Sequence, residues 1–325
     1  MRAYIIRRLL LMIPTLFLVS LIIFLLTHLI PGDVIDAMQA GVTDVKLPRA
    51  ELERQLGLDV PLMHQYGRWM GVVPQADGSF SGVFQGDLGS SLWRKVPVVQ
   101  LVAQKWPVTV ELSIMALIVA QLIALPIGVY SALRQDKWGD YVGRSFAILC
   151  ISIPGFWLGT MVIVLPSIWW DYMPPIMLVH LTEDPIGNLK MFIIPAVVMG
   201  MAMGGMTMRM TRTMMLEVLR QDYIRTAWAK GLRERVVVIR HALKNALIPV
   251  ITVIGFQLPV MIGGTVIIEQ IFCLPGMGRL IVEATLYRDY PVISGIMVLF
   301  SVGLVFINLM VDLTYAYLDP RVHYK

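Results

Sequence analysis

Long apolar stretches alternate with polar segments along the whole chain. Six of these stretches are long enough for an α-helix to cross the hydrocarbon core of a membrane, which takes about 20 residues. They cover approximately Leu9–Ile30, Val108–Leu133, Ser145–Trp170, Met191–Met208, Ala246–Ile268 and Val292–Tyr317. None shows the alternating apolar and polar positions that are typical of membrane β-barrels. The pattern therefore predicts an all-α integral membrane protein with six transmembrane helices.

The composition supports a membrane location. Hydrophobic residues make up 57% of the 325 residues and charged residues only 15%, whereas roughly 25% of an ordinary soluble chain is charged. The basic N-terminus with Arg2, Arg7 and Arg8 is similar to the start of a signal peptide. The apolar run Leu9–Ile30 that follows is longer than a signal-peptide core and lacks a small-residue cleavage site, so we expect a retained first span.

The basic residues predict the orientation in the membrane. With the N-terminus in the cytoplasm, 17 of the 27 Lys and Arg residues fall on the cytoplasmic side, as the positive-inside rule requires. We therefore expect a multi-pass protein of the inner (cytoplasmic) membrane with both termini in the cytoplasm. This topology accounts for the net charge of +5, so nucleic acid is not expected as a partner.

Two long polar segments organise the chain. The first follows the first span and is large enough for an extracytoplasmic subdomain, in which Leu62, Tyr66, Trp69 and Met70 share one face of a helix that begins after Pro61. The second is a cytoplasmic loop at 211–245. The predicted parts are the cytoplasmic N-terminus and first helix at 1–30, the extracytoplasmic subdomain at 31–105, the core with the other five helices at 106–318, and a cytoplasmic tail at 319–325.

The cytoplasmic loop is strongly basic and predicted to be helical. Between Arg209 and Lys244, nine basic residues stand against three acids. The sequence permits a helix up to Gly231 and another after it, and glycine allows either a turn or a close approach at that point. Two short helices joined near Gly231-Leu232 are therefore predicted.

The chain carries no recognisable catalytic motif. It lacks G-x-x-x-x-G-K-[ST], H-E-x-x-H, G-x-S-x-G and C-x-x-C, so we expect no catalysis by the chain itself. If the protein performs work across the membrane, its energy must then come from an ion gradient or from another chain. A gradient-driven carrier places ionisable groups inside its helices. Glu111 and Asp312 are the candidates here, although helix-end or interhelical hydrogen bonding is the favoured explanation of both.

Methionine is concentrated in and after the fourth span, with eight residues between Met199 and Met215. Thioethers bind Cu(I), so a copper path is one explanation. Methionine is also a flexible filler, and Gly200, Gly204 and Gly205 in the same stretch favour close helix packing as the other. No cysteine or histidine supports a metal site, because Cys150 and Cys273 lie far apart in the sequence.

The loop sequence resembles a known family. The run from Asp222 to Leu232, continued from Arg240 to Pro249, is similar to the cytoplasmic coupling ("EAA") loop of ABC-importer permeases of the dipeptide, oligopeptide and nickel type. Other matching motifs are spread over nearly the whole chain: Arg7-Arg8-Leu9, His28-Leu29-Ile30-Pro31-Gly32-Asp33, Leu56-Gly57-Leu58-Asp59, Gly86-Asp87-Leu88-Gly89, Pro275-Gly276, Asp289-Tyr290-Pro291 and Asp319-Pro320-Arg321. Together they resemble the first of the two permease subunits that such an importer contains. The position of the motif's glutamate holds Arg225 here, which is common in this branch of the family. The segment 74–81 and the methionine run depart from the family pattern.

The resemblance implies a fold and a set of partners. The fold is a type I ABC-importer permease core with an extracytoplasmic insertion between helices one and two. The implied partners are a second homologous permease, two ATP-binding cassette subunits and an extracytoplasmic solute-binding protein. ATP and Mg would be bound by the ATPase subunits, with no cofactor in this chain.

The resemblance also implies which residues couple the chain to an ATPase. They are expected in the loop and its return helix, at Asp222, Tyr223, Arg225, Thr226, Ala227, Ala229, Lys230, Gly231, Arg240 and His241. Peptides are the substrates that the resemblance favours. Nickel or another small solute, a gradient-driven secondary transporter, and a membrane scaffold or receptor without transport remain the alternatives, and no substrate-binding residue is predicted.

Overall fold

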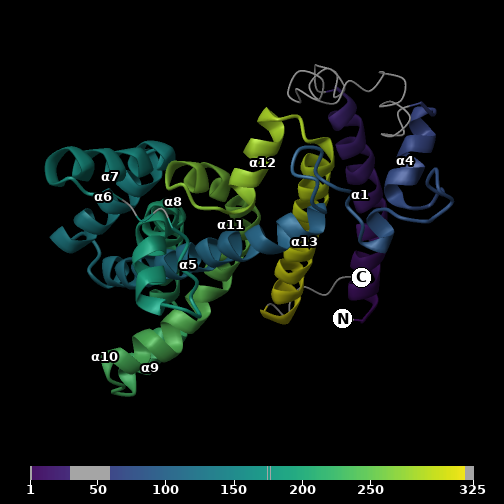
Figure 1. Cartoon of the computed structure of the whole chain (residues 1–325). Coiled ribbons are helices and arrows are strands. Elements are labelled where there is room, and N and C mark those ends of the chain that lie inside the picture. The colour runs from purple at the N-terminus through teal and green to yellow at the C-terminus, as the bar shows by residue number, and fades with distance from the viewer. Residues whose placement is uncertain (1, 30–58, 174, 176, 319–325) are drawn as a thin grey trace. The chain divides into compact units, whose positions relative to one another are not determined.

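The computed structural model describes residues 2–29, 59–173, 175 and 177–318 (Figure 1). Over these residues the chain is built from helices, with a single isolated bridge between Ser90 and Pro97. The predicted cytoplasmic tail, the first part of the predicted extracytoplasmic subdomain and the motifs at 31–33, 56–58 and 319–321 lie outside the described residues.

Within the described part of the chain, five helices are long and apolar enough to cross a membrane, or up to six if a bent pair counts as one span. This agrees with the all-α membrane fold expected from the sequence. Each of these helices contains most of one predicted stretch: α1 (Arg2–Leu29), α5 (Val98–Leu133), α8 (Pro185–Leu219), α11 (Lys244–Ile271) and α13 (Tyr290–Leu318). Two bounds differ clearly, because α5 begins at Val98 rather than Val108 and α8 continues to Leu219 rather than ending at Met208.

The third predicted span is not continuous. The sequence predicted one helix over Ser145–Trp170, but the chain forms α6 (Trp138–Ser152) and α7 (Gly155–Trp170), which are bent by 94° at the break. The cause is Pro154, whose ring disfavours helical backbone in the preceding residue. Ile153 accordingly has an extended backbone, with φ −80° and ψ 121°.

The chain divides into two compact units. One consists mainly of Val108–Pro275 and Ile307–Lys325, and the other of Arg2–Pro107 and Gly276–Phe306. We call them the inner-loop unit and the terminal unit, because the first contains the loop 211–245 and the second contains α1.

The inner-loop unit is held together by close helix contacts at glycines. A Cβ added to Gly200 of α8 would lie 2.7 Å from the carbonyl oxygen of Ala116 on α5. One added to Gly205 would lie 2.8 Å from the carbonyl oxygen of Ala147 on α6. The close packing predicted for the methionine-rich stretch is therefore confirmed at these two glycines, which allow three helix backbones to approach one another.

The terminal unit joins α1 to short elements that precede and follow the long helices. These are α4 (Leu62–Met70), the 3₁₀ turn η1 (Val83–Gln85) and α12 (Met277–Leu286), together with the first part of α13. Tyr66 and Trp69 of α4 contact Phe24 of α1, with ring centroids 5.4 and 5.9 Å apart. Met70 of the same predicted face is buried, whereas Leu62 is 44% exposed and lies outside this contact.

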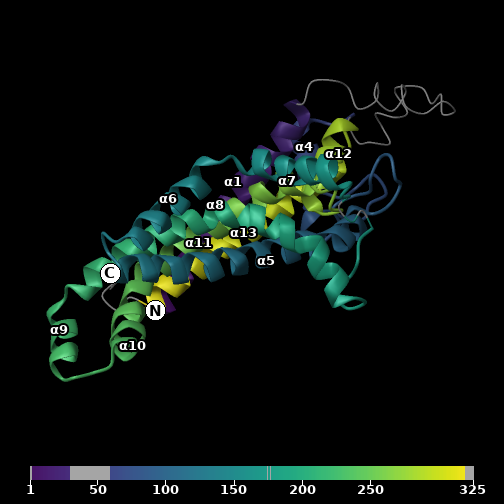
Figure 2. The same cartoon turned by 90° about the vertical axis from the view of Figure 1, so that its left-hand side faces the viewer.

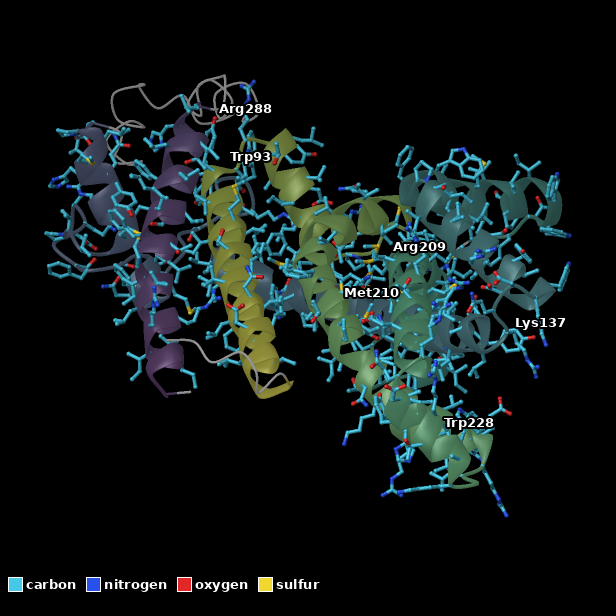
Figure 3. All side chains as sticks on the ribbon, turned by 180° about the vertical axis from the view of Figure 1, so that it is seen from behind. Trp93, Lys137, Arg209, Met210, Trp228 and Arg288 are labelled. Carbon is cyan, nitrogen blue, oxygen red and sulfur yellow. The ribbon has the colours of Figure 1, made fainter. Side chains whose placement is uncertain are left out.

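In the terminal unit, Asp289 also bonds to the segment that precedes α5. It is 4% exposed and accepts hydrogen bonds from the hydroxyl of Ser91 and from the backbone N–H of Leu92, the latter at 3.1 Å. Trp93 donates its indole N–H to the carbonyl of Tyr287 at 2.6 Å. Trp93 and Arg288 accordingly lie at the same end of this unit in Figure 3. These bonds fix the segment before α5 against the turn between α12 and α13.

Candidate functional site

The predicted loop forms a hairpin of two short helical elements at one end of the inner-loop unit. α9 (Asp222–Ala229) is followed by a turn, and then by α10 (Glu234–Val236) and the π-helical segment η2 (Val237–Leu243), which continue into α11. Figures 1 and 2 show α9 and α10 together beyond the ends of α8 and α11. The two short helices expected around Gly231 are therefore present.

Gly231 makes the turn of this hairpin possible. Its φ is +74°, a left-handed conformation that glycine adopts without steric penalty. Its N–H donates to the carbonyl of Trp228 at 2.9 Å, and the N–H of Leu232 donates to that of Ala227 at 3.4 Å. No atom lies within 4 Å of the place where a Cβ would stand. Within this chain, Gly231 therefore serves a turn, which is one of the two explanations that the sequence left open.

One face of α9 is fixed to the unit by apolar packing. Ile224 is fully buried and Ala227 is 7% exposed. They lie in one cluster with Met215 of α8 and with residues of α5, η2 and α11, namely Ala132, Val237, Val238, Ala242 and Ala246. Because this packing resembles a protein core, we expect α9 to move together with the helices beneath it.

The opposite face of α9 is open. Most of the residues predicted for coupling are exposed there or in the following turn: Asp222, Tyr223, Arg225, Thr226, Ala229, Lys230 and Gly231. Arg225 makes only an exposed ion pair with Asp222, at 3.5 Å. Ala227 differs from them, because it points into the apolar cluster and so packs α9 rather than presenting a surface.

Trp228 was not among the residues predicted for this face. It lies on α9 and is 45% exposed, and Figure 3 shows it at the hairpin end, away from Arg209 and Met210 of α8. Its indole and the ring of Tyr223, which is 44% exposed, lie on the two sides of the buried face of α9 and border the open face with two large aromatic side chains. Aromatic residues are enriched at the centre of protein interfaces. A tryptophan among small and charged residues was the available signal.

The return segment of the hairpin contains the other two predicted residues. Arg240 and His241 lie in η2, where the hydrogen-bond pattern widens to that of a π-helix. Such segments are rare and often occur at functional sites. Arg240 is exposed, and the carbonyl of His241 accepts from the side-chain amide of Asn245 at 3.1 Å. The same amide donates to the hydroxyl of Tyr223 at 2.8 Å, so Asn245 links α9 to the return segment.

A second candidate region is a cavity of about 370 Å³ in the terminal unit. Its polar lining comes from α1, α4 and the segment before α5, and includes His28, Gln65, Arg68 and Asp87. The size suits a small ligand. His28 is already engaged, with Nδ1 2.8 Å from the carbonyl oxygen of Phe24 and Nε2 3.0 Å from Oε1 of Gln65.

The carboxylate of Asp77 makes local hydrogen bonds. On the turn after α4, Ser79 donates its hydroxyl and its N–H to Asp77, and these bonds lower the pKa of that carboxyl. Among the described residues, no three His, Cys, Asp or Glu side chains gather as ligands for a metal ion.

Comparison with known proteins identifies the class. Residues 124–324 match the model of the family described as "Binding-protein-dependent transport system inner membrane component", and residues 1–113 match the model of its N-terminal part. The chain belongs to this family. It is an inner-membrane permease component of a binding-protein-dependent ABC importer.

Individual relatives cover the whole chain. A protein of Brucella suis named as a peptide transport system permease is 40% identical over 325 residues, covering 100% of both chains. The glutathione transport system permease protein GsiC of Escherichia coli K12 is 36% identical, covering 99% of both. The crystal structure of an amino acid ABC transporter with histidines matches 67% of this chain and 94% of that one, with a TM-score of 0.51 and 12% identity, which supports the fold alone.

Proposed function

We propose that this chain is one of two permease subunits of an ATP-driven importer for peptides. Relatives that match it from end to end are named for peptide and glutathione transport, and glutathione is itself a tripeptide. A second permease, two ATPase subunits that bind ATP and Mg, and an extracytoplasmic binding protein complete the importer. Both termini and the α9 hairpin face the cytoplasm, as the distribution of basic residues favours.

The observation that carries the proposal is that α9 has one buried face and one exposed face. Its inner face is fixed to α5, α8 and η2 through Ile224 and Ala227, while its outer face presents Tyr223, Arg225 and Trp228. A helix held in this way can fill a groove on a partner and pass the partner's displacement to the membrane helices. ATP-driven closure of the ATPases would then switch the permease pair between outward- and inward-facing states.

The test is copurification of the ATPase subunits from membranes that contain this chain and its genomic neighbours. Trp228→Glu places a charge on the open face without touching the buried one, and we expect it to lower ATPase recovery about tenfold or more. Phe84→Glu is the matched control, because Phe84 is 69% exposed but lies in η1 of the terminal unit. If the wild-type chain transports peptide yet recovers no ATPase, the proposed function is wrong and a gradient-driven carrier is the better explanation.

A further inference from the structure

A buried carboxylate near the α9 hairpin is enclosed by donors from several elements. Asp140, in the first turn of α6, is 0% exposed. Arg212 of α8 donates to both of its oxygens, with Nε and Nη2 each at 2.7 Å. The hydroxyl of Ser131 at the end of α5 and the backbone N–H of Asp136 also donate to it, the latter at 3.0 Å. One carboxylate thus joins α5, the α5–α6 turn, α6 and α8.

The helices that Asp140 joins are also closely packed around it. A Cβ on Gly128 of α5 would lie 2.9 Å from the carbonyl oxygen of Met208 on α8. One on Gly143 of α6 would lie 3.4 Å from the Cβ of Ser131 on α5. Helices packed this closely have little freedom to slide, and the bidentate bond between Arg212 and Asp140 fixes the register of α6 and α8 as well.

The packed group of α5, α6 and α8 is also attached to α9. Met215 lies one turn beyond Arg212 on α8 and is fully buried in the cluster that holds Ile224 and Ala227. At the end of α8, Arg220 donates to the side-chain oxygen of Gln135 in the α5–α6 turn at 3.4 Å. A displacement of α9 therefore reaches α8 through apolar packing, and reaches α6 through Arg212 and Asp140.

We propose that Asp140 and Arg212 are positioning residues that transmit movement of α9 to α6, and through it to the bent α6–α7 pair. The proposal rests on the function proposed above. A buried ion pair is a poor source of stability, because removing two charges from water offsets most of their attraction, and apolar residues of similar volume often serve as well. What the ion pair supplies is a connection of fixed geometry between α8 and α6, made by two hydrogen bonds. Such a link moves α6 in step with α8 when the permease switches states.

The experiment uses the complete importer reconstituted in liposomes, with peptide uptake and ATP hydrolysis measured on the same preparation. The quantity compared is peptide imported per ATP hydrolysed, normalised to assembled complex. For Asp140→Asn we expect this ratio to fall about tenfold while ATP hydrolysis continues. Arg144→Gln is the matched control, because Arg144 Nε lies 3.9 Å from the same carboxylate but on the same helix, so it joins nothing. It should retain the wild-type ratio.

A double variant separates loss of the connection between α6 and α8 from loss of protein stability. Asp140→Asn with Arg212→Met leaves no uncompensated buried charge, so it should assemble better than Asp140→Asn alone. A double variant that assembles but keeps the low ratio supports the proposal. A double variant that regains the wild-type ratio shows that only the unpaired charge of Arg212 was harmful. A double variant that fails to assemble shows that the ion pair serves folding. Either result overturns the proposal. If the wild type itself neither binds ATPases nor uses ATP, the proposed function fails instead.

Discussion

The hydroxyl of Tyr223 accepts a hydrogen bond from the side-chain amide of Asn245 at 2.8 Å, which joins the first turn of α9 to the first turn of α11. Tyr223→Phe removes the hydroxyl and keeps the ring. Because the bond is partly exposed, we expect the free energy of unfolding to fall by about 0.5–1 kcal/mol. Thermal unfolding of the purified chain in detergent measures the change.

Asn245→Ala is the partner variant for this bond. The double variant with Tyr223→Phe should cost no more than the larger of the two single effects, because both remove the same interaction. Fully additive losses would contradict the contribution assigned to this bond.

Gly231→Ala tests the turn between α9 and α10. Alanine at φ +74° carries a left-handed penalty of about 1–2 kcal/mol, although nothing obstructs its methyl group. We expect reduced recovery of ATPase subunits, since the hairpin loses its geometry. Gly231→Asn should be milder, because asparagine tolerates this conformation better.

Gly263→Ala is the control for Gly231→Ala. Gly263 lies within α11 and a Cβ there would also meet nothing within 4 Å, but its backbone is helical. Alanine is favoured over glycine inside a helix, so this variant should be neutral or stabilising. Equal losses for both variants would mean that the positive φ of Gly231 is not the cause.

Much of the architecture follows from the apolar pattern alone. A span of about 20 apolar residues leaves the backbone one solution in lipid, so the positions of α1, α5, α8, α11 and α13 are predictable from the sequence. The break at Pro154 could not be read with the same certainty, because a proline within a membrane helix often produces only a kink. Here the backbone of Ile153 turns fully extended, and one predicted span becomes two helices.

The open face of α9 was only partly predictable. Its position came from a motif, and the turn from Gly231, but which side chains face outward depends on the cluster around Met215. Ala227 was therefore assigned to the partner surface and Trp228 was left out of it. Asp140 was missed for a related reason. Its partners Ser131 and Arg212 lie 9 and 72 residues away along the chain, and no spacing rule connects them.

Gly200→Val tests the contact between α5 and α8. The first side-chain atom would meet the backbone oxygen of Ala116 at 2.7 Å, and backbone cannot move aside as a flexible side chain can. We expect a loss of about 1–3 kcal/mol, seen as a lower yield of folded chain. Gly264→Ala on α11 is the control, because its nearest neighbour would be the terminal methyl of Met199 at 3.6 Å. A normal yield of Gly200→Val would contradict the close packing.

Glu111→Gln separates the ATP-driven function from a gradient-driven one. One carboxylate oxygen of Glu111 is buried and has no hydrogen-bond partner among the described residues. If this group served as a proton relay, neutralising it would abolish uptake. We expect ATP-dependent peptide uptake to persist, and the same holds for Asp312→Asn. Loss of uptake in either variant, with the ATPases still bound, would favour the carrier mechanism.

The exposed thiol of Cys273 offers a test of the orientation. Cys273 follows α11, and the predicted topology places it on the extracytoplasmic side of the membrane. Cys150 is buried in α6. A membrane-impermeant thiol reagent should therefore label the chain in right-side-out vesicles and leave a Cys273→Ser variant unlabelled. Introducing Lys137→Cys into that variant moves the thiol to the exposed α5–α6 turn, labelled in Figure 3, which is predicted to be cytoplasmic. This thiol should react only in inside-out vesicles. The reverse pattern would place both termini and the α9 hairpin outside the cell, where no ATPase could reach them.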